Sequence, residues 1–182
     1  MKFMPREITL PDGRVCILRP TAPEDAGALI RYMKETSGET DFLLRYPDEV
    51  AYTEEEERMI LGRILDDPSS VMMVATVDGE IAGNCSISGH GARRKVRHRC
   101  NVAIALYRSY WHMGIGTAMM AYLTELAKKI GFTRMDLEVV AENARARALY
   151  AKCGFVESGR LHHAICLDDG TYHDFILMYR EL

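Results

Sequence analysis

The sequence has no long apolar run and no excess of positive charge. Residues 1–7 lack the apolar stretch of a signal peptide, and no later segment reaches the ~20 apolar residues that a membrane-spanning helix requires. The formal net charge is −3, whereas general nucleic-acid binding requires a basic surface. We therefore expect a cytoplasmic protein that has neither membrane nor nucleic-acid partners.

Paired cysteines are also missing. The five cysteines are an odd number, are widely spread and include no Cys-x-x-Cys motif. They are Cys16, Cys85, Cys100, Cys153 and Cys166. This pattern suggests neither a disulfide framework nor a zinc site, so we expect reduced thiols and no bound metal. His162, His163 and His173 likewise lack the spacing of metal ligands.

Hydrophobic periodicity predicts strands and helices within one domain. No internal repeat, low-complexity tract or linker divides the 182 residues, and 48% of them are hydrophobic, so residues 1–182 can bury one substantial core. The expected strands span residues 15–20, 71–77, 80–88, 95–106, 135–140, 155–167 and 171–181, and the expected helices span about 22–35, 53–67, 115–130 and 144–152. The order β-α-α-β-β-β-α-β-α-β-β implies an α/β fold with a mixed sheet covered by helices.

Capping signals mark the start of the first two helices. Thr21 with Glu24, and Thr53 with Glu56, have the three-residue spacing of a capping box. The second helix is then expected to bury one apolar face, formed by Met59, Ile60, Ile64 and Leu65.

A basic stretch lies at the start of the strand expected at residues 95–106. It contains Arg93, Arg94, Lys95, Arg97 and Arg99. At the start of a strand, this spacing favours a solvated edge that resists pairing with other sheets over a nucleic-acid site.

Residues 110–117 join that strand to the third helix. Gly114 and Gly116 stand where the helix begins, so no side chain covers the N–H groups there. The helix dipole adds partial positive charge at this end, which favours an anion such as phosphate. The alternative is a glycine turn that only packs the helix against the strand.

Two common phosphate-binding motifs do not fit these residues. A dinucleotide-binding turn needs a third glycine, but Met119 occupies that position, and about seven residues separate the strand from Gly114. A Walker motif needs Gly-Lys-Ser/Thr, which is absent. We therefore expect backbone amides to bind a phosphate ester while the adjacent strand offers main-chain groups to a linear ligand. The expected binding residues are Ile104, Ala105, Leu106, Trp111, His112, Met113, Gly114, Ile115, Gly116 and Thr117.

Two segments resemble the GNAT N-acetyltransferase superfamily. Residues 104–116 resemble its motif A, Arg/Gln-x-x-Gly-x-Gly/Ala, and residues 143–155 resemble its second hallmark, Asn-x-x-Ala-x-x-Leu-Tyr-x-x-x-Gly-Phe. The resemblance extends from about residue 70 to the C-terminus. It implies a single-domain fold with a mostly antiparallel sheet flanked by helices, and transfer of the acetyl group of acetyl-CoA to a primary amine.

Motif A departs from the family pattern at one position. Trp111 stands where the family has Arg or Gln, so a cationic contact to the pyrophosphate of acetyl-CoA would be lost if one is needed. His112 or Arg108 could substitute for it. Trp111 as an aromatic wedge between helix and sheet is an equally open interpretation.

The resemblance assigns chemical roles to three residues. Tyr150 is the candidate general acid, because a phenol stays protonated at neutral pH and can protonate a departing thiolate; on spacing alone it reads as a core tyrosine. Asn143 is expected to cap the short helix and to contact the pantetheine arm or its adjacent phosphate. Glu138 is the candidate general base, although a water relay is an alternative. Its Leu-Glu-Val context resembles ribosomal-protein alanine N-acetyltransferases.

The acceptor amine is expected at the acidic, aromatic segment after the first helix. Glu39, Asp41 and Phe42 are the candidate contacts, because negative charge favours a cation, although a merely solvated loop fits equally well. The acceptor could be a protein N-terminus, a polyamine, an amino acid or another small amine. A homodimer is an open possibility, and a non-catalytic acyl-CoA-binding module is the alternative function.

Overall fold

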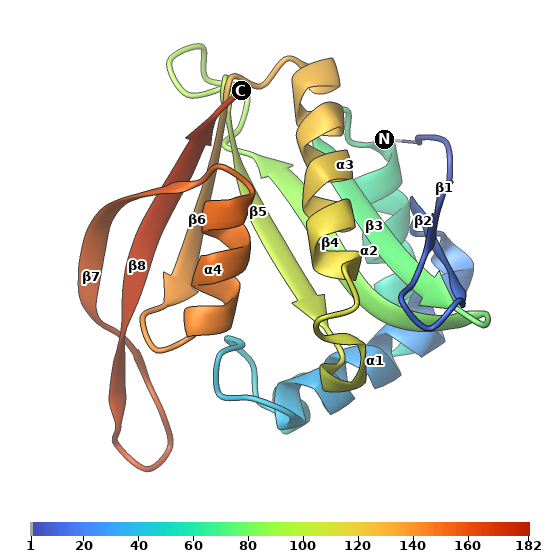
Figure 1. The fold of residues 1–182 in the computed structure, drawn as a ribbon, viewed down its shortest axis with the longest axis horizontal. Helices are drawn as coiled ribbons and strands as arrows, with labels where there is room; N and C mark the ends of the chain where they lie inside the picture. The colour runs from blue at the N-terminus through green and yellow to red at the C-terminus, as the bar shows by residue number, and fades with distance from the viewer. Residues whose placement is uncertain (1) are drawn as a thin grey trace.

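The computed structural model describes residues 2–182 and contains one sheet of eight strands (Figure 1). The spatial order is β1-β2-β3-β4-β5-β6-β8-β7, and every neighbouring pair is antiparallel except β5 and β6. The strands are β1 (Arg6–Thr9), β2 (Val15–Pro20), β3 (Ser70–Val77), β4 (Glu80–Gly89), β5 (Arg99–Leu106), β6 (Arg134–Val140), β7 (Val156–Cys166) and β8 (Tyr172–Glu181). The α-helices are α1 (Ala26–Gly38), α2 (Glu54–Asp66), α3 (Ile115–Ile130) and α4 (Ala144–Lys152), with 3-10 turns η1 (Pro23–Asp25), η2 (Pro47–Glu49) and η3 (Arg108–Tyr110).

Helices cover both faces of the sheet. Along β3, Met73 and Ala75 join the core that α3 buries, whereas Val74 joins a second core with residues of α1 and α2. This alternation follows from the two-residue period of a strand. Figure 1 shows α3 and α4 in front of the sheet and α1 and α2 behind it. The predicted α/β architecture is therefore confirmed.

The parallel contact between β5 and β6 is short. It has three register positions and ends where Asn101 lies opposite Asp136. Beyond that point β5 continues to Leu106 beside β4, and β6 continues to Val140 beside β8, so the two strands diverge (Figure 1). The backbone of β5 after Asn101 therefore has no strand partner on its β6 side.

Asp136 ties the two strands together at this junction. Its carboxylate accepts hydrogen bonds from Arg99 Nε at 2.9 Å and from Arg134 Nε at 2.8 Å. Burial acts to raise the pKa of Asp136, but the hydrogen bonds from the two arginines outweigh it and lower that pKa.

The start of the chain differs from the sequence prediction in two respects. Strand β1 was not predicted, and the capping box of Thr21 with Glu24 was wrong. Pro23 begins the 3-10 turn η1, whose capping carboxylate is that of Asp25, which accepts from Ala22 N at 2.8 Å. Thr21 instead donates its hydroxyl to Met72 O, and α1 begins only at Ala26.

The basic stretch does not lie at the start of a strand. Residues 93–98 form a turn in which Val96 N and Arg97 N both donate to Arg93 O at 3.0 Å, so β5 starts at Arg99 rather than near residue 95. The expectation of a charged strand edge was therefore wrong, because local hydrogen bonds hold these residues in a turn.

Helix α2 starts as predicted but buries a different face. Glu56 N donates to Thr53 Oγ1 at 3.2 Å and Thr53 N donates to Glu56 Oε2 at 2.8 Å, which completes the predicted capping box. Met59, predicted to be inside, is 48% exposed, whereas Glu57 and Leu61 are 4% and 0% exposed. Relative to the prediction, the helix is rotated about its axis so that Leu61 points into the core. Glu57, one turn earlier on the same face, is therefore buried as well.

Two further observations concern the described residues. Within residues 2–182, no helix is both long and apolar enough to span a bilayer, and no group of three or more His, Cys, Asp or Glu side chains could hold a metal ion. All five cysteines are free thiols.

Candidate functional site

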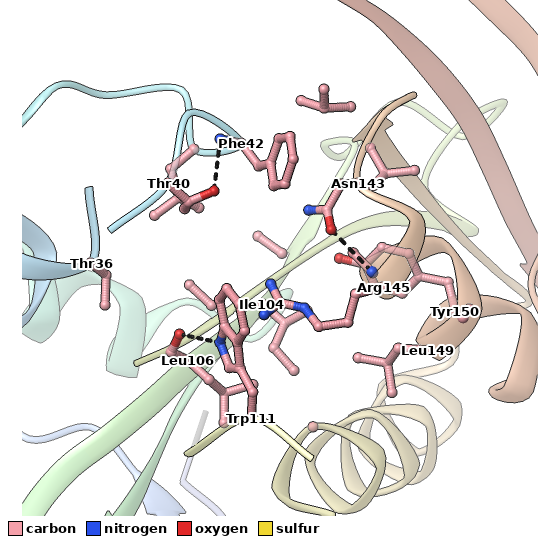
Figure 2. A pocket seen from close by; sticks show the side chains of 18 of the residues that line it. Thr36, Thr40, Phe42, Ile104, Leu106, Trp111, Asn143, Arg145, Leu149 and Tyr150 are labelled. Carbon is pink, nitrogen blue, oxygen red and sulfur yellow. Dashed lines mark hydrogen bonds between the residues drawn. The ribbon is translucent and has the colours of Figure 1, made fainter. Parts of the chain in front are cut away.

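A cavity of about 1140 Å³ occupies the space where β5 and β6 diverge (Figure 2). Its walls come from the end of β5, the turn before α3, the end of β6, the helix α4 and the loop after α1. The cavity therefore brings together the two family-like segments of the sequence, which lie about 40 residues apart.

The turn before α3 forms one end of the cavity. His112 and Gly114 have left-handed backbones, with φ of 63° and 84°, and Ala118 N is the first amide to donate into the helix, to Gly114 O at 3.1 Å. The N–H groups of residues 115–117 precede that bond and have no helical partner. This arrangement suits an anion, because unpaired amides and the positive end of the dipole coincide.

The two glycines of this turn serve different purposes. A Cβ on Gly114 would contact nothing within 4 Å, so glycine is needed there for its left-handed conformation. A Cβ on Gly116 would lie 3.2 Å from Leu149 Cδ2 and 3.5 Å from Leu106 Cδ1. Gly116 therefore allows α3 to pack closely on α4 and β5, so the anion-binding and packing interpretations apply to different positions.

Most of the predicted cofactor-binding residues line the cavity. They are Ile104, Ala105, Leu106, Trp111, His112, Gly114, Ile115, Gly116, Thr117 and Asn143. Met113 is not among the lining residues and packs against the core under α3. Trp111 is fixed in place because its indole N–H donates to Leu106 O at 3.0 Å.

Arg145 is the site residue that the sequence did not reveal. It comes from the first turn of α4 and crosses the cavity, so that its guanidinium Cζ lies 2.9 Å from the ring centroid of Trp111 (Figure 2). Its Nη1 is buried and has no hydrogen-bond partner among residues 2–182. Burial and then the positive charge of Arg108 lower the pKa of Arg145. This cation lacks an anionic partner. Arg145 occupies a variable position of the second hallmark, and the unusual Trp111 was the only hint of it.

Tyr150 and Asn143 lie on the α4 side of the cavity. Tyr150 is 6% exposed and lines the cavity. Burial raises the pKa of Tyr150 to about 12. Asn143 Oδ1 accepts from Ala146 N at 3.1 Å, which confirms the predicted helix cap and leaves the amide nitrogen available to donate.

Glu138 lines the same cavity from β6. Its neighbours Leu137 and Val139 are both buried in the core, whereas Glu138 is exposed. Alternation along the strand accounts for this difference. The carboxylate therefore reaches the cavity while keeping contact with solvent.

The predicted acceptor residues divide into two groups. Glu39 and Phe42 line the cavity, and Asp41 is exposed outside it. The Glu39 carboxylate accepts from Arg108 N at 2.8 Å, and its carbonyl accepts from the Arg108 guanidinium. These bonds fix the loop after α1 against η3, so Glu39 has a structural partner in addition to any ligand.

Comparison with known proteins gives a family match and close structural neighbours. Residues 32–155 match the acetyltransferase (GNAT) family. The chain is 27% identical over 125 residues to the L-amino acid N-acetyltransferase AaaT of Escherichia coli K12, and the match covers 68% of this chain and 76% of that protein.

Solved structures share the whole architecture. A GNAT-family acetyltransferase from Streptococcus pneumoniae is 28% identical with a TM-score of 0.87, and the match covers 92% of this chain and 99% of that one. Ribosomal-protein-alanine N-acetyltransferase from Brucella melitensis gives a TM-score of 0.79 at 22% identity, with 91% and 99% covered. The Salmonella typhimurium protein yncA, solved with its cofactor acetyl-CoA, gives 0.78 at 17% identity, with 92% and 94% covered.

Proposed function

Because this chain belongs to the GNAT acetyltransferase family and is an acetyl-CoA-dependent N-acetyltransferase, we propose that a primary amine attacks the thioester directly, with Tyr150 as general acid and Glu138 as general base. The observation that carries the proposal is the cavity between β5 and β6, which both side chains line. Acetyl-CoA supplies the activated acetyl group. The residues of this chain must bind it, orient it and move two protons.

The phosphate groups of acetyl-CoA fit the turn before α3. The N–H groups of residues 115–117 lack helical partners, and the left-handed Gly114 exposes the backbone. Residues 104–106 of β5 then lie beside the pantetheine arm, and the free amide nitrogen of Asn143 donates to it. A backbone N–H of residues 104–106 is the proposed donor to the oxyanion that forms during transfer.

Arg145 supplies the cation that motif A lacks. Trp111 replaces the usual Arg or Gln, but the Arg145 guanidinium stacked on its indole lies in the same cavity and has a buried, unpaired Nη1. A cation with this desolvated environment favours an anionic ligand, because pairing restores the solvation that burial removed. We therefore assign Arg145, rather than His112, to the pyrophosphate.

Tyr150 suits the acid role because it holds its proton at neutral pH. Its pKa of about 12 reflects burial, which disfavours the phenolate. The same environment disfavours a thiolate formed next to it, so the proton affinity of the leaving sulfur rises as well. The Tyr150 hydroxyl then gives its proton to that sulfur.

Glu138 suits the base role because it reaches both the cavity and solvent. An acceptor amine is mostly protonated at neutral pH and must lose a proton before it attacks. A solvent-connected carboxylate can accept that proton directly or through water and release it afterwards. Glu39 and Phe42, which line the cavity, are the proposed contacts on the acceptor side.

The relatives are named for different acceptors, so the test must cover several classes of amine. One is an L-amino acid N-acetyltransferase and another is a ribosomal-protein-alanine N-acetyltransferase. The test of the function is thiol release from acetyl-CoA with a panel of primary amines, alongside calorimetric titration with CoA. Turnover with one amine class supports the proposal, and CoA binding without turnover of any amine contradicts it.

Two further expectations belong to the proposal. Five free thiols agree with a reducing, cytoplasmic location. Strand β7 is one of the two edge strands of the sheet, with β1 at the other edge, and exposes Val156 and Leu161, which would suit a homodimer. Light scattering in solution measures the oligomeric state directly.

A further inference from the structure

A second cavity, of about 350 Å³, lies on the face of the sheet that α1 and α2 cover. Leu43, Arg45 and residues 103–105 line both this cavity and the larger one, so the two adjoin along β5. This contact lies beyond Asn101, where β5 has already separated from β6. A molecule in the second cavity can therefore reach toward the thioester from the face opposite α3 and α4.

Glu57 places a carboxylate in the wall of the second cavity. It is 4% exposed, and it lines the cavity from α2. Burial raises the pKa of Glu57, and the nearby charge of Arg45 opposes this shift without a direct contact. Burial removes part of the water around this carboxylate, so a cation that entered the cavity would stabilise its charge.

The other walls of the cavity combine apolar side chains with polar ones such as Asn84 and Ser86. The apolar lining side chains include Met33, Ile60, Ile64, Met72 and Ile87. A volume of about 350 Å³ lies at the lower end of the range for small-molecule sites, about 300–1,000 Å³. The combination of one carboxylate and an aliphatic wall fits a small cation that is carried on an alkyl chain.

An amine at Glu57 would lie apart from the residues proposed to carry out the reaction. Tyr150 and Glu138 line only the larger cavity, and Glu57 lines only the smaller one. The reacting nitrogen must be neutral when it attacks, whereas a buried carboxylate holds a charged ammonium most strongly. The cation at Glu57 is therefore a second charged group of the acceptor.

We propose that the second cavity is an acceptor subsite, in which Glu57 binds the distal ammonium of an alkyl diamine whose other amine is acetylated. This inference rests on the proposed function. A simple polyamine and a basic amino acid share the required chemistry. Only the basic amino acid also has a carboxylate, and Arg45 at the boundary of the two cavities would bind it.

The test compares 1,5-diaminopentane with n-pentylamine, which has the same chain and one amine fewer. We expect the wild-type enzyme to prefer the diamine in kcat/KM by about 10- to 100-fold, as for a buried charge-assisted hydrogen bond. Glu57→Gln should reduce the preference to about 1 while CoA affinity stays unchanged. Glu55→Gln is the matched control on the exposed side of α2 and should keep the preference.

Two more measurements separate a binding role from a structural one. Glu57→Asp has a shorter side chain and should shift the preference toward 1,6-diaminohexane, which no loss of packing would do. L-lysine has the structure of 1,5-diaminopentane with an added carboxylate. Comparing kcat/KM for L-lysine and for the diamine shows whether the acceptor is a basic amino acid or a polyamine. If lysine is preferred and Arg45→Gln removes that advantage, the acceptor is a basic amino acid. If the diamine is preferred, the acceptor is a polyamine.

The failures of the two proposals are distinguishable. Equal kcat/KM for diamine and monoamine in the wild type, or an unchanged preference in Glu57→Gln, overturns the subsite and leaves the acetyltransferase mechanism intact. Absence of turnover with every amine, despite CoA binding, overturns the proposed function itself.

Discussion

The guanidinium of Arg145 stacks on the indole of Trp111, with Cζ 2.9 Å from the ring centroid. The indole is in turn held by its hydrogen bond to Leu106 O. A helix and a turn from opposite sides of the cavity thus present one half-buried cation. Trp111 therefore acts as a platform for a positive charge that the turn itself does not contain.

Replacing this cation should weaken binding of the phosphates and little else. We expect Arg145→Ala to raise the Kd of CoA by about 10- to 100-fold, since a hydrogen bond to a charged group contributes about 1.5–3 kcal/mol. Calorimetry measures the Kd. Turnover of S-acetylpantetheine, which lacks the pyrophosphate, should change much less.

Arg147→Ala is the matched control, because Arg147 lies on the same helix but pairs with Glu157 and does not line the cavity. Equal losses in both variants, or an equal loss with S-acetylpantetheine, would remove Arg145 from the phosphate site.

Tyr150→Phe should lower kcat by about 100-fold, as expected for a lost general acid, with CoA affinity nearly intact. The phenyl ring still fills the buried position beside Phe155, so the fold is retained. Steady-state kinetics and calorimetry give the two quantities. Tyr172→Phe, on the exposed β7–β8 hairpin, should behave as wild type. Full turnover by Tyr150→Phe would show that another group protonates the thiolate.

Gly114→Glu should abolish CoA binding. A side chain there costs about 1–2 kcal/mol for the left-handed backbone, and its carboxylate repels the phosphates. Gly131→Glu, at the other end of α3, carries a similar backbone cost with φ of 103° and should still bind CoA. Titration calorimetry on both variants separates loss of fold from loss of the site. Retained affinity in Gly114→Glu would move the phosphate site elsewhere.

Glu57→Gln should stabilise the free protein at neutral pH. The pKa of Glu57 is raised in the folded state, so the folded protein binds its proton more tightly than the unfolded chain. Stability is therefore lost as pH rises above the ordinary value of 4.5, and the loss is complete above the raised pKa. Glutamine avoids this loss, so we expect Glu57→Gln to have a higher Tm than the wild type at neutral pH.

The gain should shrink below pH 4.5, where the carboxyl is protonated in both states. Thermal unfolding between acidic and neutral pH measures it, with Glu55→Gln as the exposed control. A lower Tm for Glu57→Gln at neutral pH would mean that the carboxylate has a stabilising partner.

Asp136→Asn should loosen the junction of β5 and β6. The pKa of Asp136 is lowered in the folded state, so its contribution to stability is present above the ordinary value of 3.8 and is lost as pH falls through the lowered pKa. Because the arginines Arg99 and Arg134 are only partly buried, we expect a loss of about 1–2 kcal/mol at neutral pH, measured by denaturant unfolding. An unchanged midpoint would contradict this role.

Local patterns predicted the elements that carry their own signals. The period of α3, the glycine at its end and the Asn143 cap are all local, and the structure confirms them. Strand β1 and the late start of α1 could not be predicted, because tertiary pairing with β2 and the 3-10 turn at Pro23 decide them. The same limit applies to α2, where packing around Leu61 buried Glu57 instead of Met59.

The site was predictable where the backbone binds the ligand and hidden where distant side chains meet. The turn at Gly114 and the helix cap at Asn143 follow from residue type and position. Arg145 could not be found, because its contact with Trp111 depends on the crossing of α4 over the cavity. The sequence showed that a cation was missing from motif A but not which residue replaced it.

The early end of the β5–β6 ladder has a consequence for inhibitor design. The two substrates would approach each other from opposite faces of the sheet, through the gap between β5 and β6. One covalent conjugate of CoA and a diamine could therefore extend through this gap and occupy the CoA site and the acceptor subsite at the same time. Joining the halves turns the second contact into an intramolecular event at high effective concentration, so such a conjugate should bind far more tightly than either half.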